Sequence, residues 1–213
     1  MVVSPGPGLS RIFASLGVAA IVDGGQTMNP STQELLAAFE NLPTDNVIIL
    51  PNNKNILMTS NQAKEVTVKN VAVVPSKSIP QGLAAMLVHN PDGALEAVAE
   101  KMTKALATVK TGEITIATRS VEIDGVKVKE GQVIALLDGK LVSSAKSVEE
   151  SVLNLLKTAK AEELELATLI YGEGVSRGEA DRIVDSIREN YTALEIEVQD
   201  GGQPHYQFII SIE

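Results

Sequence analysis

The 213-residue sequence contains no cysteine and only two histidines. Without cysteine, the chain cannot form disulfides, present a thiolate nucleophile or bind zinc through cysteine. His89 and His205 are distant in the sequence, and neither belongs to a His-Glu-x-x-His pair, so no compact set of metal ligands is present. The lack of cysteine is compatible with a reducing cytoplasm, where we expect the protein to act.

Aromatic residues make up only 3% of the sequence, and its Lys and Arg residues do not cluster. Because single-stranded nucleic acids stack on aromatic side chains and duplexes bind clustered basic ones, nucleic acid is not an expected partner. The formal charge of −9 instead favours another protein or a small ligand. No apolar run approaches the ~20 residues that a membrane span requires, and no signal peptide opens the chain.

Motifs of nucleotide-binding and hydrolytic enzymes are also missing. Neither G-x-x-x-x-G-K-[ST] nor G-x-S-x-G occurs in the sequence. The segment Ser4-Pro5-Gly6-Pro7-Gly8 precedes a helical pattern, but it lacks G-x-G-x-x-G spacing and its two prolines remove backbone N–H donors. With no nucleophile–base pair visible, the sequence does not predict catalysis by this chain.

Short apolar runs alternate with amphipathic helical patterns over residues 1–90. The runs at 19–22, 47–50 and 71–74 predict strands that are apolar on both faces, as in a covered parallel sheet. Helices are expected between them, including one at 55–65. Three further helices have their own signals. Leu9, Ile12, Phe13 and Leu16 have the apolar spacing of a buried helix face. Ser31 and Glu34 form a capping-box pattern, and Pro80 suits the first turn of a helix. The alternation predicts βαβ units.

A turn-forming cluster at residues 90–93 marks the expected domain boundary. The fold class predicted is therefore a parallel α/β domain over 1–90, followed by an α+β domain over 91–213. The second domain is expected to open with a long helix from Leu95 to Val109 and to end with strands at 194–198 and 206–212.

Local signals in the second domain point to hairpins and capped helices. Asp124-Gly125 and Asp138-Gly139 tolerate the positive φ of type I′ hairpin turns. Ser147 with Glu150, and Ser176 with Glu179, predict capping boxes at the starts of two helices.

Three polar loops, 24–31, 51–55 and 75–81, follow the three predicted strands of the first domain. Because open α/β sheets bind ligands at the carboxyl ends of their strands, these loops predict a shared polar surface. The candidate binding residues are Gln26, Thr27, Asn29, Asn52, Asn53, Lys54, Asn55, Ser76, Lys77, Ser78 and Gln81. The alternative is that they only cap helices and form turns, although the polar run at 52–55 exceeds what one cap requires.

A second candidate group lies near the C-terminus. Gly201-Gly202-Gln203-Pro204 forms a predicted loop between two strands, and Gln203, His205 and Tyr206 are its candidate binding residues. A purely structural role for this loop remains open. His89 is interpreted as structural, because it follows an apolar helix and precedes Asn90-Pro91.

Five segments carry a resemblance to a known family: GGQTMNPST (24–32), PNNKNI (51–56), PSKSIPQGLAAML (75–87), VKTGEIT (109–115) and GGQP (201–204). Together they resemble the C-terminal region of the fatty acid kinase A subunits, also described as dihydroxyacetone-kinase-related. The resemblance covers essentially the whole chain. It implies a non-catalytic part of a longer bacterial kinase chain, with ATP and Mg bound by an N-terminal domain of that chain and no cofactor here. A homodimer of the longer chain is compatible with it.

The chain also resembles DegV proteins, the fatty-acid-binding partners of this kinase, through Thr27-Met28-Asn29-Pro30-Ser31 and Val74-Pro75-Ser76-Lys77-Ser78. This implies a DegV-like fold. Where DegV proteins carry a Ser-rich stretch this chain has 51–55, and where they carry a histidine it has Gln199-Asp200-Gly201-Gly202. The resemblance therefore implies docking of a DegV-like fatty-acid carrier. The alternative is a lipid or small anion held in a cleft between the domains.

Overall fold

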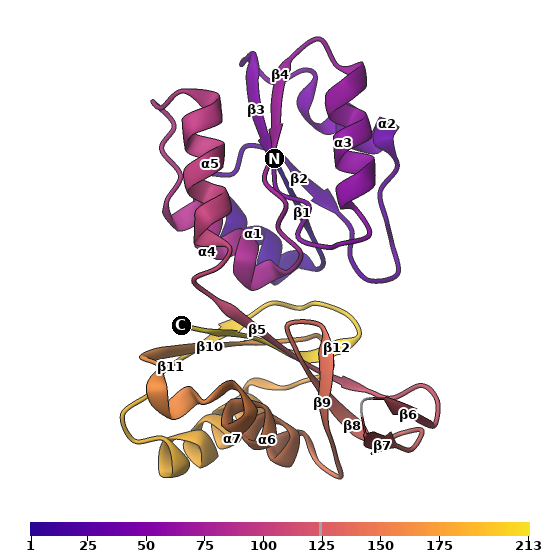
Figure 1. Ribbon diagram of the computed structural model, residues 1–213, viewed down its shortest axis with the longest axis vertical. Coiled ribbons are helices and arrows are strands. Elements are labelled where there is room, and N and C mark those ends of the chain that lie inside the picture. Colours follow the sequence, from indigo (N-terminus) through magenta and orange to yellow (C-terminus); the bar gives the residue numbers. More distant parts are fainter. Residues whose placement is uncertain (124) are drawn as a thin grey trace. The chain divides into compact units, whose positions relative to one another are not determined.

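The computed structural model describes residues 1–123 and 125–213. They form two compact units, unit 1 (Met1–Val109) and unit 2 (Lys110–Glu213), each with its own sheet and helices (Figure 1). This division lies later in the chain than the expected boundary at residue 90. The reason is that helix α5 (Leu95–Ala105), predicted to open the second domain, packs against other elements of unit 1.

Parallel strands form the centre of unit 1. Strand β1 (Val2–Ser4) pairs with β2 (Ile21–Asp23), and β3 (Asn46–Ile49) pairs with β4 (Asn70–Val73). A parallel bridge between Val2 and Leu50 joins the two pairs, so the strand order is β2-β1-β3-β4. Because β2 and β3 lie on opposite sides of β1, the strand order reverses between the ends of β1 and β3. Such a reversal is where open α/β sheets bind ligands.

Each strand of unit 1 leads into a helix, as the alternating pattern predicts. The helices are α1 (Pro7–Ser15), α2 (Thr32–Phe39), α3 (Leu57–Val66) and α4 (Ile79–Leu87), followed by α5. Since the strands are parallel, α1 to α4 all begin at the carboxyl edge of the sheet. The predicted capping box at α2 is confirmed, because Ser31 Oγ accepts a hydrogen bond from Glu34 N and Glu34 reciprocates. Val3, Phe39 and Ile49 belong to the apolar core beneath the helices.

A six-stranded mixed sheet forms the centre of unit 2, in the order β11-β10-β12-β5-β8-β9. Its strands are β5 (Lys110–Ile116), β8 (Val133–Leu137), β9 (Lys140–Ala145), β10 (Leu166–Tyr171), β11 (Glu195–Asp200) and β12 (Tyr206–Ile212). Strands β10 and β11 are parallel, and the other pairs are antiparallel. Strands β6 (Val121–Ile123) and β7 (Val126–Val128) form a separate hairpin.

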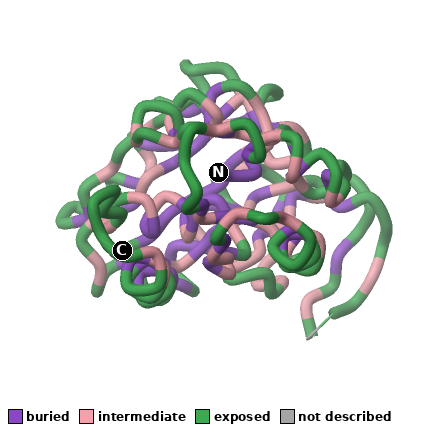
Figure 2. The backbone as a smooth tube through the Cα atoms, turned by 90° about the horizontal axis from the view of Figure 1, so that it is seen from above, coloured by how far each residue is buried: buried purple, intermediate pink, exposed green. Residues whose placement is uncertain are grey.

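Helices α6 (Val148–Ala159) and α7 (Arg177–Asn190) supply apolar side chains to the core of unit 2, and a short 3-10 helix, η1 (Ala161–Glu163), follows α6. Figure 2 shows buried positions gathered in the interior and exposed ones on the outer turns of the backbone. The mixed architecture confirms the predicted α/β class, with α+β organisation in unit 2.

Among the described residues, no helix combines the length and apolar character that crossing a membrane would need.

Most of the turns and helix caps predicted in unit 2 are present in the structure. Asp138 and Gly139 adopt the predicted positive φ, 50° and 76°, in the turn between β8 and β9. Gly125 also has positive φ, whereas its predicted partner Asp124 lies outside the described residues. Ser176 forms a full capping box with Glu179. The box predicted at Ser147 is half formed, because the Glu150 carboxylate accepts from Lys146 N instead.

One feature of unit 2 and one of the helix that precedes it differ from expectation. Helix α5 ends at Ala105 rather than Val109. Strand β10 was not predicted, although it pairs with both β11 and β12. Its sequence, LATLIY, is rich in residues that also suit a buried helix, so periodicity does not identify it.

Candidate functional site

The three predicted polar loops meet at the carboxyl edge of unit 1. Asn53 Nδ2 donates to Gln26 Oε1 at 3.3 Å, which connects the loop after β3 to the loop after β2. Ser76 Oγ donates to Asn52 Oδ1 at 2.7 Å, which connects the loops after β4 and β3. We call the exposed residues of these loops the carboxyl-edge surface: Gln26, Thr27, Met28, Asn29, Lys54, Asn55 and Lys77, with Met58 at the start of α3.

Asn52 belongs to the interior rather than to this surface. Its side chain donates to Val3 O at 3.0 Å, while its backbone N donates to Ser76 Oγ at 3.0 Å. Both Asn52 and Ser76 are buried, at 7% and 0% exposure. Asn52 also has a φ of 54°, which asparagine tolerates better than most residues. Asn52 and Ser76 therefore hold the ends of β1, β3 and β4 together and are not available to a partner.

The Asn52 side chain also fills the crevice at the strand reversal. It reaches from the end of β3 to the Val3 carbonyl of β1, and helix α4 packs directly against it. A Cβ atom at Gly82 of α4 would overlap Asn52 Oδ1, so glycine is required at that position. The place where this class of sheet binds ligands is thus occupied by the chain's own amide.

Other candidates at this edge serve as caps. Ser78 Oγ accepts from Gln81 N at 3.4 Å at the start of α4, and Gln81 Oε1 accepts from Lys77 N at 2.8 Å. Asn55 N donates to Asn53 Oδ1 at 2.9 Å. These bonds explain part of the polar composition by local structure, the alternative that the sequence left open.

In unit 2 the GGQP loop is held by its own glutamine. Gln203 is buried, and its Nε2 donates to Ile170 O at 2.9 Å. A Cβ at Gly201 would overlap Gln203 Oε1, and one at Gly172 would overlap Tyr206 O. Gln203 therefore ties the loop to strand β10 and is not exposed to a partner.

His205 and Tyr206 follow the same loop. His205 is exposed with a φ of 68°, and its carbonyl oxygen accepts from Thr115 Oγ1 at 2.7 Å. Burial and the nearby Glu113 carboxylate raise the pKa of the Tyr206 hydroxyl above its ordinary value. Tyr206 therefore keeps its proton at neutral pH and is unsuited to act as a base. Both residues belong to unit 2.

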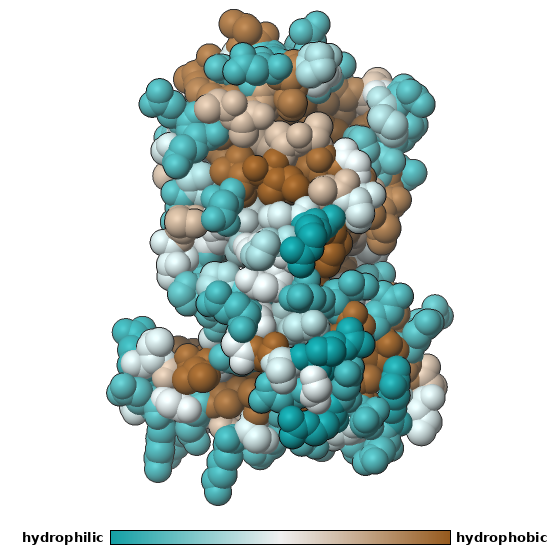
Figure 3. Space-filling model, turned by 180° about the vertical axis from the view of Figure 1, so that it is seen from behind, coloured by the Kyte–Doolittle hydropathy of each residue, from teal (hydrophilic) through white to brown (hydrophobic). Residues whose placement is uncertain are grey.

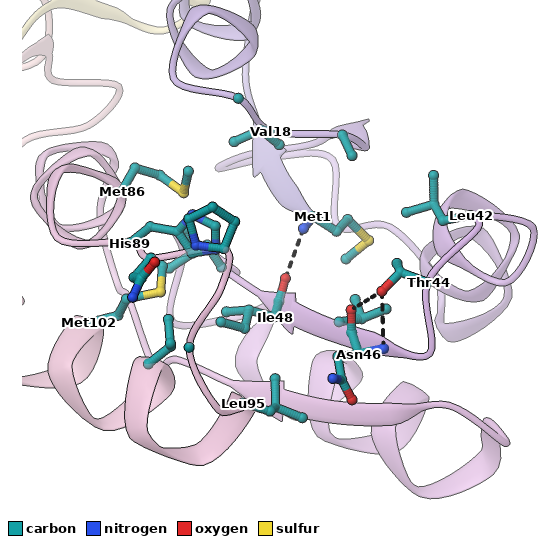
Figure 4. A pocket seen from close by; sticks show the side chains of 18 residues that line it. Met1, Val18, Leu42, Thr44, Asn46, Ile48, Met86, His89, Leu95 and Met102 are labelled. Atoms are coloured by element: carbon teal, nitrogen blue, oxygen red, sulfur yellow. Dashed lines mark hydrogen bonds between the residues drawn. The ribbon is translucent and has the colours of Figure 1, made fainter.

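A pocket that the sequence did not reveal lies at the opposite, amino edge of the unit 1 sheet (Figure 4). Its volume is about 250 Å³, and it is lined by apolar side chains together with polar groups, with Met86, His89 and Met102 on one side. The Met1 amine donates to Ile48 O at 2.8 Å, and burial lowers the pKa of this amine to about 6. Burial, and then the Met1 amine, lower the pKa of His89.

The helix ends beside this pocket disfavour an anion in it. Gly17 and His89, which follow the C-caps of α1 and α4, line the pocket, and helix C-termini carry partial negative charge. Within the described part of the chain, no group of three or more His, Cys, Asp or Glu side chains could hold a metal ion. Apolar lining residues look like ordinary core residues in a sequence, so no signal identified this pocket beforehand.

Solved structures with the same fold include DegV proteins. A DegV family protein from Corynebacterium glutamicum matches with a TM-score of 0.68 and 15% identity, over 99% of this chain and 95% of that chain. The Streptococcus pneumoniae fatty acid kinase B3 protein, solved with linoleic acid, matches with a TM-score of 0.62 and 14% identity, over 86% of this chain and 76% of that one. At these identities the likeness establishes the fold, which is DegV-like as predicted.

Sequence relatives are considerably closer. Protein YloV of Bacillus subtilis is 38% identical over 211 residues, which cover 99% of this chain and 38% of that protein. An uncharacterized protein of Staphylococcus aureus strain USA300 is 41% identical over the same length and again 38% of its own length. The chain thus spans well under half of these relatives. The family model for the C-terminal region of fatty acid kinase A-like subunits matches residues 1–213. The chain therefore belongs to this FakA-like C-terminal family.

Proposed function

We propose that this chain docks a DegV-like fatty-acid-carrier protein, so that the carrier's acyl carboxylate can be phosphorylated by an ATP-binding domain elsewhere in a longer kinase chain. The observation that carries this proposal is the carboxyl edge of unit 1. The Asn52 side chain fills the crevice there, while Gln26, Lys54 and Lys77 around it remain exposed. A filled crevice with an exposed polar rim suits contact with a macromolecule better than capture of a small ligand.

Docking would contribute to the reaction without any catalytic group in this chain. A carrier held next to the kinase domain presents its bound acyl chain at a high effective concentration, which accelerates transfer without new contacts to the substrate. Two findings support a DegV-like fatty-acid carrier as the partner. The chain belongs to a fatty acid kinase A-like family, and the similar Streptococcus pneumoniae fatty acid kinase B3 protein was solved with linoleic acid.

Changing Asn53 and Lys54 together to alanine tests this proposal. Both hydrogen bonds of the Asn53 side chain are exposed to solvent, and Lys54 forms no ion pair with a described residue. The free energy of unfolding should therefore change by no more than ~0.5 kcal/mol, and the melting temperature should stay nearly constant. Calorimetric titration of a loaded DegV-like carrier from the same organism should show at least a roughly fivefold loss of affinity, the effect of ~1 kcal/mol at an interface.

Two outcomes of that titration would contradict the proposal. One is a wild-type chain that does not bind the carrier. The other is a double variant that unfolds easily while its folded fraction binds normally, which would make the two residues structural. In that case the docking surface would have to be sought in unit 2, beginning with His205 and Tyr206.

Under the same proposal the chain itself does not turn over ATP, and ATP with Mg²⁺ binds only in another part of the longer, cytoplasmic kinase chain. The segment at the end of β1 supports this. Pro5 and Pro7 remove two N–H donors there, and Gly6 begins α1 with no side-chain cap. A homodimer of the longer chain is compatible with this arrangement.

The second candidate function is binding of a lipid or small anion by this chain. We expect the purified chain to carry no long-chain fatty acid, because Asn52 fills the strand reversal and the amino-edge pocket disfavours a carboxylate. Mass spectrometry of an organic extract of the chain, with the loaded carrier as positive control, checks this expectation. Stoichiometric acyl chains in the extract would reverse the ranking of the two functions.

A further inference from the structure

Two methionines are exposed beside the polar loops of the carboxyl edge. Met28 is 56% exposed and Met58 is 70% exposed. Between helices α2 and α3, Thr32 Oγ1 donates to Gln62 Oε1 at 3.2 Å. Met58 lies one turn before Gln62 in α3, and Met28 precedes Thr32 by four residues. Both methionines therefore lie on the carboxyl-edge side of this contact between the helices.

Exposed methionines of this kind are typical of binding surfaces. The thioether side chain is flexible and polarisable, so it adapts to an apolar recess on a partner. Figure 3 shows apolar side chains reaching the surface of unit 1 in patches bordered by hydrophilic groups. At the carboxyl edge, Met28 and Met58 supply exposed apolar atoms beside the polar residues of the loops, and apolar groups with a polar border are typical of a protein interface.

Two lysines lie on the joined loops next to the methionines. Lys54 follows Asn53, whose side chain is bonded to Gln26, and Lys77 follows Ser76, whose side chain is bonded to Asn52. Both lysines are exposed, and within residues 1–123 and 125–213 neither forms an ion pair. Their ammonium groups are therefore available to carboxylates outside the chain.

The helix ends add positive character to the same edge. The first turns of α1, α3 and α4, all within the described part of the chain, hold no Asp or Glu, whereas α5, α6 and α7 carry Glu in theirs. Acidic residues normally stabilise that end of a helix by offsetting its partial positive charge. At this edge the offset is confined to α2, where Glu34 caps the helix, and to Asp23 at the end of β2.

The charged residues are distributed unequally between the two units. Unit 1 contains seven Lys or Arg and eight Asp or Glu residues, whereas unit 2 contains eleven and nineteen. Nearly all of the net charge of −9 therefore resides in unit 2. An acidic partner would be repelled by unit 2 and could approach unit 1.

We propose that the carboxyl-edge surface recognises an acidic patch with an apolar recess on its protein partner. Carboxylates of the partner pair with Lys54 and Lys77, and the recess receives Met28 and Met58. This inference rests on the proposed docking function and specifies its chemistry. An anionic membrane fits less well, because binding to anionic lipids typically uses clusters of roughly four to eight Lys or Arg residues, and this surface presents only Lys54 and Lys77.

Charge reversal tests the electrostatic part. The variant K54E/K77E should bind the loaded carrier roughly tenfold more weakly, chiefly through slower association. Raising the salt concentration from about 0.05 to 0.5 M should weaken wild-type binding and affect the variant much less, since screening acts on the removed attraction. The matched control is K64E/K101E, which makes the same change of net charge at exposed lysines outside the carboxyl-edge surface and should bind like wild type.

The methionines are tested by M28Q/M58Q, which keeps side-chain length and removes apolar character. This variant should lose at least about fivefold in affinity with no change in salt dependence. The control V68T alters a fully exposed apolar residue, 103% exposed, that precedes β4 and so lies away from the carboxyl edge. Its affinity should be unchanged.

The outcomes separate this inference from the docking function. Normal carrier binding by K54E/K77E and M28Q/M58Q would overturn the acidic-patch inference and leave docking intact. No binding by the wild-type chain would overturn both. Wild-type and control chains that sediment with anionic vesicles of phosphatidylglycerol, and lose the carrier, would identify a membrane as the occupant and also overturn the inference.

Discussion

Replacing Gly172 with alanine is expected to destabilise unit 2 by about 3 kcal/mol. Gly172 follows β10, and a Cβ there would overlap Tyr206 O and lie 2.6 Å from Gln203 O. Both contacts are to backbone atoms, so no side-chain rotation can relieve them. Relief would require moving the start of β12 away from β10, which would also break the bond from Gln203 to Ile170.

Tyrosine fluorescence during urea unfolding measures this effect selectively. The three tyrosines, Tyr171, Tyr191 and Tyr206, all lie in unit 2. A loss of ~3 kcal/mol should lower the urea midpoint of this signal by roughly 1 to 3 M, because slopes for small domains are ~1–3 kcal/mol per M. Gly174→Ala is the matched control, since no described heavy atom lies within 4 Å of a Cβ at that position. Equal midpoints for the two variants would contradict the structural interpretation of the GGQP loop.

Much of the fold could be predicted because its signals are local. The capping box at Ser31 and the turn at Asp138-Gly139 depend on residues within a few positions of one another, and both occur as expected. The alternation of apolar runs and helical patterns in unit 1 is also a local property. Strand β10 and the packing of α5 against unit 1 depend on contacts made at long range, and the sequence did not reveal either.

The candidate site shows the same limit more sharply. Asn52 and Asn53 are adjacent and identical in type, and the sequence alone treats both as binding residues. Their roles differ because Asn52 adopts positive φ and meets Ser76, which is 24 residues away, and Val3, which is 49 away. Asn53 instead remains partly exposed beside Gln26. No spacing rule in the sequence separates these two asparagines.

Replacing Asn52 with alanine should therefore destabilise unit 1 by about 3 kcal/mol. The change leaves Val3 O and the Ser76 hydroxyl hydrogen without a partner in the interior, although Ser76 Oγ still accepts from the backbone N of residue 52. Each lost partner costs ~1–3 kcal/mol. Alanine at a φ of 54° adds strain of about 1 kcal/mol or more. Asn52→Gly removes the same side chain without that strain, so its loss should be smaller by about 1 kcal/mol.

Unit 1 contains no tyrosine, so tyrosine fluorescence does not report on its unfolding. Hydrogen exchange of the β3 and β4 amides measures the stability of unit 1 instead. Exchange there should become faster in Asn52→Ala and stay at the wild-type rate in Asn53→Ala, the matched control. Adding Ser76→Ala to Asn52→Ala should cost less than the sum of the two single changes, since both remove the same bond. Full additivity, or equal exchange in the two asparagine variants, would mean that Asn52 does not hold the strand ends together. The crevice at the strand reversal would then be open to a ligand.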